Sequence, residues 1–398
     1  MTSAQQPRRV ASPLTVAAQW GRIGITGFGG PPAHIALLRE LMVQRRGWMD
    51  ARTFEDANAA CGLLPGPAST QLAMYCAYRV GGPLGTVVGG LAFITPAVVA
   101  VLVLSALVLG HAPPSWVRGA GAGAGAAVAA VALHAARGLV GPSLERARAR
   151  AGRPAWVVYV AAGTAAAALI GPWLVLVLVG CGLVELARQR PRAGGSMALA
   201  AVPVSPVAAV VKLLAVAGVA AGGVGALMWT ALKVGALSFG GGFVIIPLMQ
   251  GDAVHVQHWM TNAQFLNAVA LGQVTPGPVV ATVAAVGYAA HGLAGGVLAA
   301  AVAFTPSFAF VLIGGRRFER LRVNPRPRAF LDGAGPAAIG AIAGAAITLA
   351  LSLSQVWQAG VLAAAVVALL MLGRGVVITL LTAAAIGVVL ALAGAPLP

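Results

Sequence analysis

Two cations lie inside strongly apolar segments of this 398-residue chain, each at the same distance before a Phe-Gly-Gly triplet. Arg22 precedes Phe28 by six residues, and Lys233 precedes Phe239 by six residues. A Lys or Arg side chain within a membrane span is costly and is functional by default. Two converging cations would suit a doubly charged anion, so the sequence predicts an anion site. The alternative is that each cation reaches a membrane interface or pairs with a carboxylate.

Glycines and prolines interrupt the apolar segments next to these cations. FGGPP begins at residue 28, FGGG begins at residue 239, and a Pro-Gly-Pro follows each of them, at 65–67 and 276–278. Proline is well tolerated at the first helical position, so these motifs predict that one helix stops and another restarts. A restarted helix presents free N–H groups that attract anions, and glycine lets a ligand approach them. In lipid such groups must face a polar cavity or a ligand.

The predicted site combines the cations, the glycines of the breaks and the polar residues beside them. The alternative for each Ser or Thr is a bond to a carbonyl of its own helix. Coupling to protons requires a group that titrates near the anion, and histidine or a desolvated carboxylate can serve. The alternative for Asp56 is that it caps the start of its helix after Thr53. The residues expected to bind substrate are Arg22, Lys233, Gly29, Gly30, Gly66, Gly240, Gly241, Gly277, Thr26, Ser238, Gln71 and Thr275, and those expected to carry protons are His34 and Asp56.

The composition predicts an integral membrane protein. The chain is 59% apolar and only 9% charged, whereas soluble domains carry about 25% charged residues. Apolar windows at 84–110, 155–187 and 375–395 are long enough to span a bilayer as helices. The net charge of +17 does not indicate nucleic-acid binding, because the arginines cluster in short loops between apolar spans.

The sequence predicts neither a metal site nor an enzyme. Cys61, Cys76 and Cys181 show no paired spacing, and the HxxH at 255–258 has no further ligand nearby. The nine acidic residues are scattered and are not grouped with the histidines. We therefore expect a transporter without a cofactor. An anion channel is the alternative of another class, and saturable counterflow would separate the two.

The chain is a tandem repeat. The Phe-Gly-Gly motifs give an offset of 239 − 28 = 211, and the same offset pairs Trp48 with Trp259 and Phe93 with Phe304. The two Pro-Gly-Pro motifs also match at this offset. We expect one repeat at 1–200 and a second at 201–398.

Loop charges predict that the two repeats have opposite orientations in the membrane. Segment 39–52 is basic, whereas its partner 250–263 has no Lys or Arg. Segment 315–328 carries six arginines opposite the neutral segment 111–117. Lys and Arg are enriched in cytoplasmic loops. The expected fold is therefore an all-α polytopic membrane protein of two inverted-topology repeats, with broken and re-entrant helices that meet at the midplane.

A path through the membrane follows from these breaks and charges. The helix before the first Phe-Gly-Gly is expected to run in from outside and to continue toward the basic loop 39–52. Residues 53–82 are expected to form a re-entrant hairpin broken at Pro-Gly-Pro. Full spans are expected at 84–110, 118–139, 155–170 and 172–187. The Gly/Ala-rich runs at 119–130 and 333–346 indicate close helix packing.

The motifs of both halves resemble those of the chromate transporter family, in its long two-domain form. They are FGGPPAHI at 28–35 with Trp48, Phe54 and LPGPASTQ at 64–71, repeated as FGGG, Trp259, Phe265 and TPGP. The second half departs from them: Gly242 stands in place of Pro31, Ile245 in place of His34 and Thr282 in place of Gln71.

The resemblance covers nearly the whole chain and implies export of chromate, driven by the proton-motive force, across the bacterial inner membrane. Sulfate, a similar tetrahedral dianion, is the natural competitor, and a sulfate importer of the same fold is the alternative function. The partners expected are a small oxyanion and the lipid bilayer, without nucleic acid. A homodimer is a compatible assembly.

Overall fold

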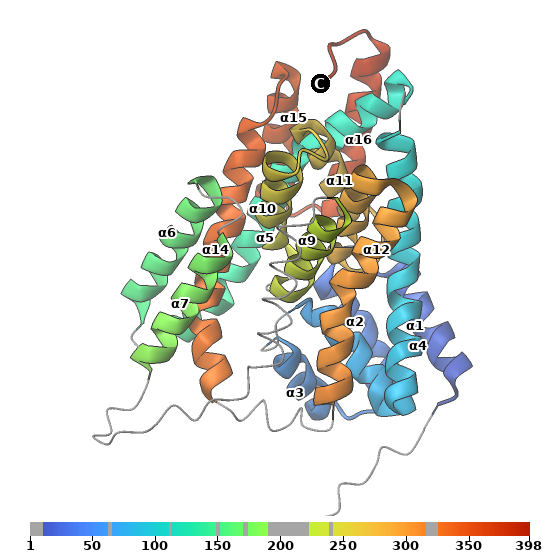
Figure 1. Cartoon of the computed structure of the whole chain (residues 1–398), viewed down its shortest axis with the longest axis vertical. Coiled ribbons are helices and arrows are strands. Elements are labelled where there is room, and N and C mark those ends of the chain that lie inside the picture. Colours follow the sequence, from blue (N-terminus) through green and yellow to red (C-terminus); the bar gives the residue numbers. More distant parts are fainter. Residues whose placement is uncertain are drawn as a thin grey trace, which may run out of the picture.

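The computed structural model describes residues 11–62, 66–110, 113–148, 152–169, 174–189, 223–238, 242–315 and 325–398. Every regular element within these ranges is a helix, which confirms the predicted all-α class (Figure 1). Four of the described helices are long and apolar enough to cross a membrane. These are α4 (Ala68–Val108), α5 (Ser115–Arg148), α12 (Val283–Gly314) and α14 (Pro325–Leu351).

The first half begins with short helices that stop at the predicted breaks. α1 (Pro13–Thr26) ends at Gly27, and α2 (Pro31–Arg39) restarts after Gly29 and Gly30. These two glycines have φ angles of 97° and 73°, in the left-handed region that favours glycine. α2 passes into the π-helix η1 (Glu40–Arg45), and α3 (Ala51–Cys61) precedes the Pro-Gly-Pro motif. The restarts predicted after both motifs are therefore present in this half.

α4 consists of two antiparallel parts that meet at Gly82. This glycine has φ 65° and ψ −156°. A Cβ built at Gly85 would overlap the carbonyl oxygen of Ala77. Residues eight apart in one continuous helix are separated by about 12 Å, so the chain reverses here. Residues 68–81 and α3 form a helical hairpin over the segment that was predicted to be re-entrant, and residues 83–108 form a long helix.

The second half repeats this order of elements. It contains α9 (Val224–Leu237), α10 (Ile245–Gln250), the π-helix η4 (Gly251–Val256), α11 (Asn262–Val274), the 3₁₀ turn η5 (Val279–Thr282) and α12. The π-helices of the two halves begin at equivalent positions, 251 − 40 = 211. α12 reverses at Gly292, with φ 63° and ψ −155°, as α4 does at Gly82.

The repeat changes register by one residue after the Pro-Gly-Pro motifs. The two reversal glycines give 292 − 82 = 210, and the Thr-Pro dipeptides at 95–96 and 305–306 share this offset. The prediction of one constant offset of 211, which paired Phe93 with Phe304, is therefore wrong in this region. The second half has one residue fewer between its Pro-Gly-Pro motif and its reversal, and the reversal fixes the register of the helix that follows.

α1 begins at the end of the molecule where the loop after η1 lies. Val16 lies next to Gly89, and Gly24 lies against the carbonyl of Phe93. α1 therefore runs parallel to residues 83–108 and begins at the end where α4 reverses. The prediction that this helix runs in from the opposite side is wrong, because the glycine break turns the chain back. In Figure 1, α1, α2 and α3 occupy the lower part, whereas α9, α10 and α11 occupy the upper part.

The remaining helices form two short hairpins. One is α6 (Arg153–Leu169) with α7 (Leu174–Arg188), and the other is α15 (Val356–Val366) with η6 (Val367–Met371) and α16 (Val376–Leu392). α6 and α7 contain 17 and 15 residues, fewer than the roughly 20 residues of a full span. Their bounds match the segments predicted at 155–170 and 172–187 to within two residues, and both helices are short for a full span.

Each of these hairpins packs on a long helix of the other half through glycine. A Cβ at Gly340 of α14 would overlap the carbonyl oxygen of Val160 in α6. A Cβ at Gly123 of α5 would likewise overlap the carbonyl oxygen of Ala383 in α16. Such close backbone approach requires glycine, which confirms the packing role predicted for the two Gly/Ala-rich runs. The two halves are therefore interleaved, and the predicted boundary at residues 200 and 201 lies outside the described residues.

We expect Gly340→Leu to destabilise the protein by about 1–3 kcal/mol, the usual cost of overpacking a tight contact. The substituted side chain would push α6 away from α14. Gly360→Leu is the matched control, because Gly360 has open space around its Cβ position. Thermal unfolding in detergent should show a lower midpoint for Gly340→Leu alone, and equal midpoints for the two variants would contradict the packing role.

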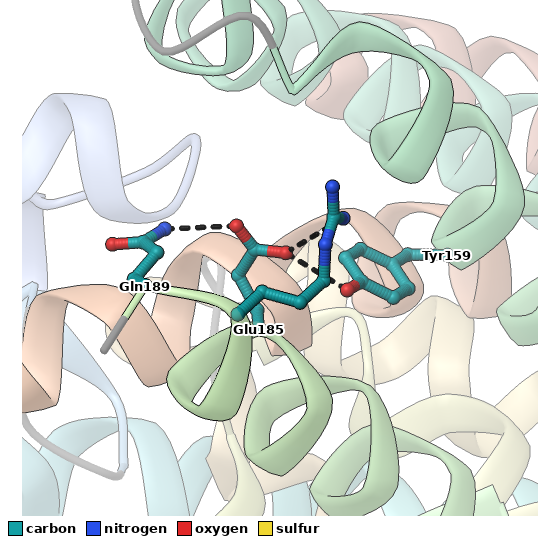
Figure 2. Close-up of polar contacts among 4 residues, drawn as sticks. Tyr159, Glu185 and Gln189 are labelled. Carbon is teal, nitrogen blue, oxygen red and sulfur yellow. Dashed lines mark hydrogen bonds and ion pairs between the residues drawn. The ribbon is translucent and has the colours of Figure 1, made fainter. Parts of the chain in front are cut away.

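A polar cluster ties α6 to α7 away from the helix breaks. The Glu185 carboxylate accepts hydrogen bonds from Tyr159 (2.8 Å) and from the side-chain amide of Gln189 (2.9 Å), as Figure 2 shows. Arg188 also pairs with Glu185 at 3.2 Å. Within the described part of the chain, the small pocket beside this cluster contains none of the residues predicted to bind substrate.

Candidate functional site

The Pro-Gly-Pro motif of the first half lies against helices of the second half. A Cβ built at Gly66 would lie 3.2 Å from the carbonyl oxygen of Gly235 in α9. It would also lie 3.4 Å from the hydroxyl oxygen of Ser307 in α12. Gly66 has a φ of 115°, so its backbone conformation and its surroundings both favour glycine.

The Pro-Gly-Pro motif of the second half makes the reciprocal contact. A Cβ built at Gly277 would lie 3.7 Å from the carbonyl oxygen of Gly24 in α1 and 2.7 Å from the Cβ of Ala97 in α4. Gly24 is the equivalent of Gly235 at offset 211, and Ala97 is the equivalent of Ser307 at offset 210. Each Pro-Gly-Pro motif therefore packs at the same place on the opposite half.

The Phe-Gly-Gly breaks meet at the same region. The Gly277 N–H donates to the carbonyl of Gly27, which follows α1, at 3.0 Å. Cβ atoms built at Gly30 and Gly242 would lie 3.8 Å and 3.3 Å from side-chain atoms of Val279. All the described breaks thus converge between the halves. Gly240 and Gly241, which were predicted to bind substrate, lie outside the described residues.

Three buried hydroxyl groups lie on the elements that meet here. Thr70, Ser238 and Ser307 are fully buried, and their hydroxyl oxygens have no hydrogen-bond partner within the described part of the chain. Buried polar groups are nearly always satisfied, by protein, water or ligand. Ser238 Oγ lies 3.6 Å from the Cβ position of Gly242, and Ser307 lies beside Gly66. These hydroxyls are suited to donate hydrogen bonds to an oxyanion.

His34 bridges the first break. Its Nε2 lies 3.0 Å from the carbonyl oxygen of Gly27, and its Nδ1 lies 3.3 Å from the hydroxyl oxygen of Ser69. Because a carbonyl can only accept, Nε2 carries the hydrogen, and Nδ1 accepts from Ser69 in the neutral ring. The ring also meets Phe93 edge-on, with centroids 5.0 Å apart. A proton on Nδ1 would reverse this bond, so that the Ser69 hydroxyl accepts from the ring instead of donating to it. Ser69 lies in the first turn of α4.

The two cations of the prediction have different surroundings. Arg22 is exposed on α1. Lys233 is mostly buried and pairs with Asp252 of η4 at 2.5 Å. Asp252 also accepts a hydrogen bond from the Thr230 hydroxyl at 2.8 Å. Lys233 therefore pairs with a carboxylate in this conformation, as the alternative to an anion ligand predicted. Asp252 was not among the residues predicted from the sequence.

The other predicted polar residues divide into helix-bonded and buried groups. The hydroxyls of Thr26 and Thr275 donate to the carbonyls of Arg22 and Leu271 in their own helices, both at 2.9 Å. Gln71 is fully buried, with its amide nitrogen 2.6 Å from the Cβ position of Gly66.

Asp56 is half-buried on α3 and does not cap that helix. Asp50 is the cap, since its carboxylate accepts from the backbone N–H of Thr53 at 2.9 Å. The neighbouring Glu55 pairs with Arg39 at 3.0 Å. The capping alternative for Asp56 is therefore wrong.

A family model described as "Chromate transporter" matches residues 14–186 and 225–388, which include the described breaks of both halves. The chain belongs to the chromate transporter family. It is therefore a multi-pass membrane protein and a transporter rather than an enzyme. The resemblance seen in the motifs is confirmed.

Curated relatives match along most of both chains. The chain is 31% identical to a chromate transport protein of Cupriavidus metallidurans over 340 residues, which cover 83% of this chain and 80% of that protein. It is 31% identical to a chromate transport protein of Pseudomonas aeruginosa, over 84% of this chain and 80% of the relative. It is 29% identical to a probable chromate transport protein of Synechococcus elongatus, with 82% of each chain covered. No solved structure matches the chain.

Proposed function

We propose that this protein exports chromate across the bacterial inner membrane, as a secondary active transporter that binds the dianion between its two halves. Family membership supports chromate as the substrate. The observation that carries the location of the site is the reciprocal packing of Gly66 on Gly235 and of Gly277 on Gly24. It brings helix restarts and buried hydroxyls of both halves to one region, as in transporters that bind substrate at discontinuous helices.

The proposed site combines three kinds of group that suit a tetrahedral dianion. Backbone N–H groups in the first turn of α4 are free to donate, whereas α2 begins with Pro31 and Pro32, which have no N–H and therefore contribute less. The hydroxyls of Thr70, Ser238 and Ser307 add neutral donors. Arg22 and Lys233 supply positive charge, and Gln71 lies beside the Gly66 break. Sulfate has the same shape and charge and should compete for these donors.

We further propose that the halves, divided near residue 200, are inverted repeats in the membrane. The placement of α1–α3 and α9–α11 in opposite parts of the molecule supports this (Figure 1). The reciprocal contacts of the two Pro-Gly-Pro motifs are those expected of a pseudo-two-fold axis. Because arginines mark cytoplasmic loops, the end that holds the α5–α6 connection should face the cytoplasm.

Single cysteines should reveal this topology in intact cells. Cysteines placed at Ser115 and Ser354 should react with an impermeant maleimide, whereas those at Gly141 and Arg328 should react only after lysis. The native cysteines Cys61, Cys76 and Cys181 are buried, so background labelling should be low. Labelling of Ser115 and Arg328 variants from the same side would contradict the inverted arrangement.

The membrane potential and a proton coupling would both drive export. A negative interior favours the exit of an anion by about 2.3 kcal/mol per charge per 100 mV. We assign proton coupling to His34, with Asp56 as the second candidate. His34 supports this because its ring connects the first break to the restart of α4 through Gly27 and Ser69.

Accumulation of chromate in cells with and without the protein tests the proposed function. Expression should lower the steady-state chromate content of the cells. It should lower that content in the presence of external sulfate as well. Sulfate content should be measured in parallel. Higher chromate or sulfate content on expression would show an importer instead.

A further inference from the structure

A buried ion pair lies beside the break in the second half. Lys233 of α9 and Asp252 of η4 approach to 2.5 Å, with side-chain exposures of 11% and 8%. Thr230 donates to the same carboxylate oxygen, and the Lys233 ammonium lies 5.6 Å from the centre of the Trp229 ring. Such a pair is held firmly, because removing either partner leaves an uncompensated buried charge.

The first half of the protein has no equivalent of this pair. The counterpart of Lys233 is Arg22, and the counterpart of Asp252 is Leu41, since 252 − 41 = 211. Leu41 is buried in the first π-helix, and Arg22 is exposed. The same helical hairpin therefore forms with leucine at this position. The carboxylate is not a requirement of the fold, so it needs another explanation.

Lys233 lies close enough to the helix break for its ammonium group to reach either Asp252 or an anion bound at the break. Lys233 precedes Ser238 by five residues, a separation of about 7.5 Å along a helix. Ser238 is one of the buried hydroxyls that have no hydrogen-bond partner within the described part of the chain. A lysine side chain is long and flexible, with an ammonium that can swing between neighbouring acceptors. An anion at the break and the Asp252 carboxylate would therefore compete for one ammonium group.

We propose that Asp252 is a built-in counter-ion that holds Lys233 while the anion site is empty and yields it when a dianion binds. The inference rests on the proposed anion site and adds a residue that regulates its affinity. Asp252 acts through Lys233, so it is a positioning residue. Its competition would weaken anion binding and speed anion release, because the carboxylate reclaims the ammonium as the anion leaves.

Initial rates of chromate uptake into inside-out vesicles test this proposal through KM and Vmax. Asp252→Asn should lower KM by about tenfold, within the usual range of coupling between two sites, and should also lower Vmax because release slows. Lys233→Met should raise KM by a similar factor. Asp252→Glu should restore values close to wild type. Glu55→Gln is the control, because it breaks an exposed ion pair of the same type and should change neither constant.

A double variant separates this role from a purely structural one. Lys233→Met with Asp252→Leu removes both charges and reproduces the leucine of the first half. It should fold and keep the raised KM of Lys233→Met. Recovery of wild-type KM in the double variant, or an unchanged KM in a folded Asp252→Asn protein, would overturn the proposal. Absence of saturable chromate uptake by the wild-type protein would instead contradict the proposed function.

Discussion

Gly277→Val should reduce chromate transport to background while the protein stays inserted in the membrane. The φ of 102° at Gly277 is unfavourable for any β-branched residue. A Cβ there would lie 2.7 Å from the Cβ of Ala97. The resulting shift would weaken the hydrogen bond from the N–H of residue 277 to the carbonyl of Gly27. Backbone strain of this kind costs on the order of 1–3 kcal/mol. We expect the strain to displace the break rather than to unfold the surrounding long helices.

The measurement is initial chromate uptake into inside-out vesicles, normalised to the amount of folded protein in the membrane. Gly66→Val should have the same effect, because Gly66 makes the reciprocal contact with Gly235. Gly138→Val is the matched control, since Gly138 lies on α5 with open space around its Cβ position. Wild-type rates in both break variants would mean that these glycines do not shape the transport site.

His34→Gln should abolish the stimulation of transport by a pH gradient while leaving anion exchange intact. The histidine bonds the Gly27 carbonyl through Nε2 and the Ser69 hydroxyl through Nδ1, so a second ring proton would change the contacts of the break. Glutamine retains an N–H donor for Gly27 but cannot take up a proton at neutral pH. The substitution therefore removes the titratable group and retains the hydrogen bond to the Gly27 carbonyl.

Two assays on the same vesicles separate these functions. Counterflow of labelled chromate reports anion exchange, and uptake with an imposed pH gradient reports coupling. Asp56→Asn serves as the comparison, because Asp56 is the second candidate for the proton. Full pH dependence in both variants would indicate that neither residue carries the proton and would favour transport driven by the membrane potential alone.

The local helix breaks could be predicted from the sequence, because glycine and proline act on the backbone at their own positions. Phe28-Gly29-Gly30 and Gly66 mark places where the structure stops one helix and starts another. The direction of the chain beyond each break could not be predicted in the same way. The reversal of α2 onto α1 depends on packing against α4, which no local pattern specifies.

The polar contacts at the site were harder to predict, because their partners are distant in sequence. Asp252 lies 19 residues after Lys233 (252 − 233), on the other arm of a hairpin. Ser307 could not be predicted from the repeat, because its equivalent in the first half is Ala97, which has no hydroxyl. The repeated Thr-Pro dipeptides at 95–96 and 305–306 contained the signal for the corrected register.

Energised inside-out vesicles test the central claim most directly, because their interior corresponds to the outside of the cell. Vesicles that contain the wild-type protein should accumulate labelled chromate with saturable kinetics, and unlabelled sulfate should inhibit this uptake. Vesicles that contain Gly277→Val should remain at the level of membranes without the protein. Accumulation in right-side-out vesicles alone would contradict an exporter and indicate an importer. Non-saturable flux in both kinds of vesicle would contradict an exporter and indicate a channel.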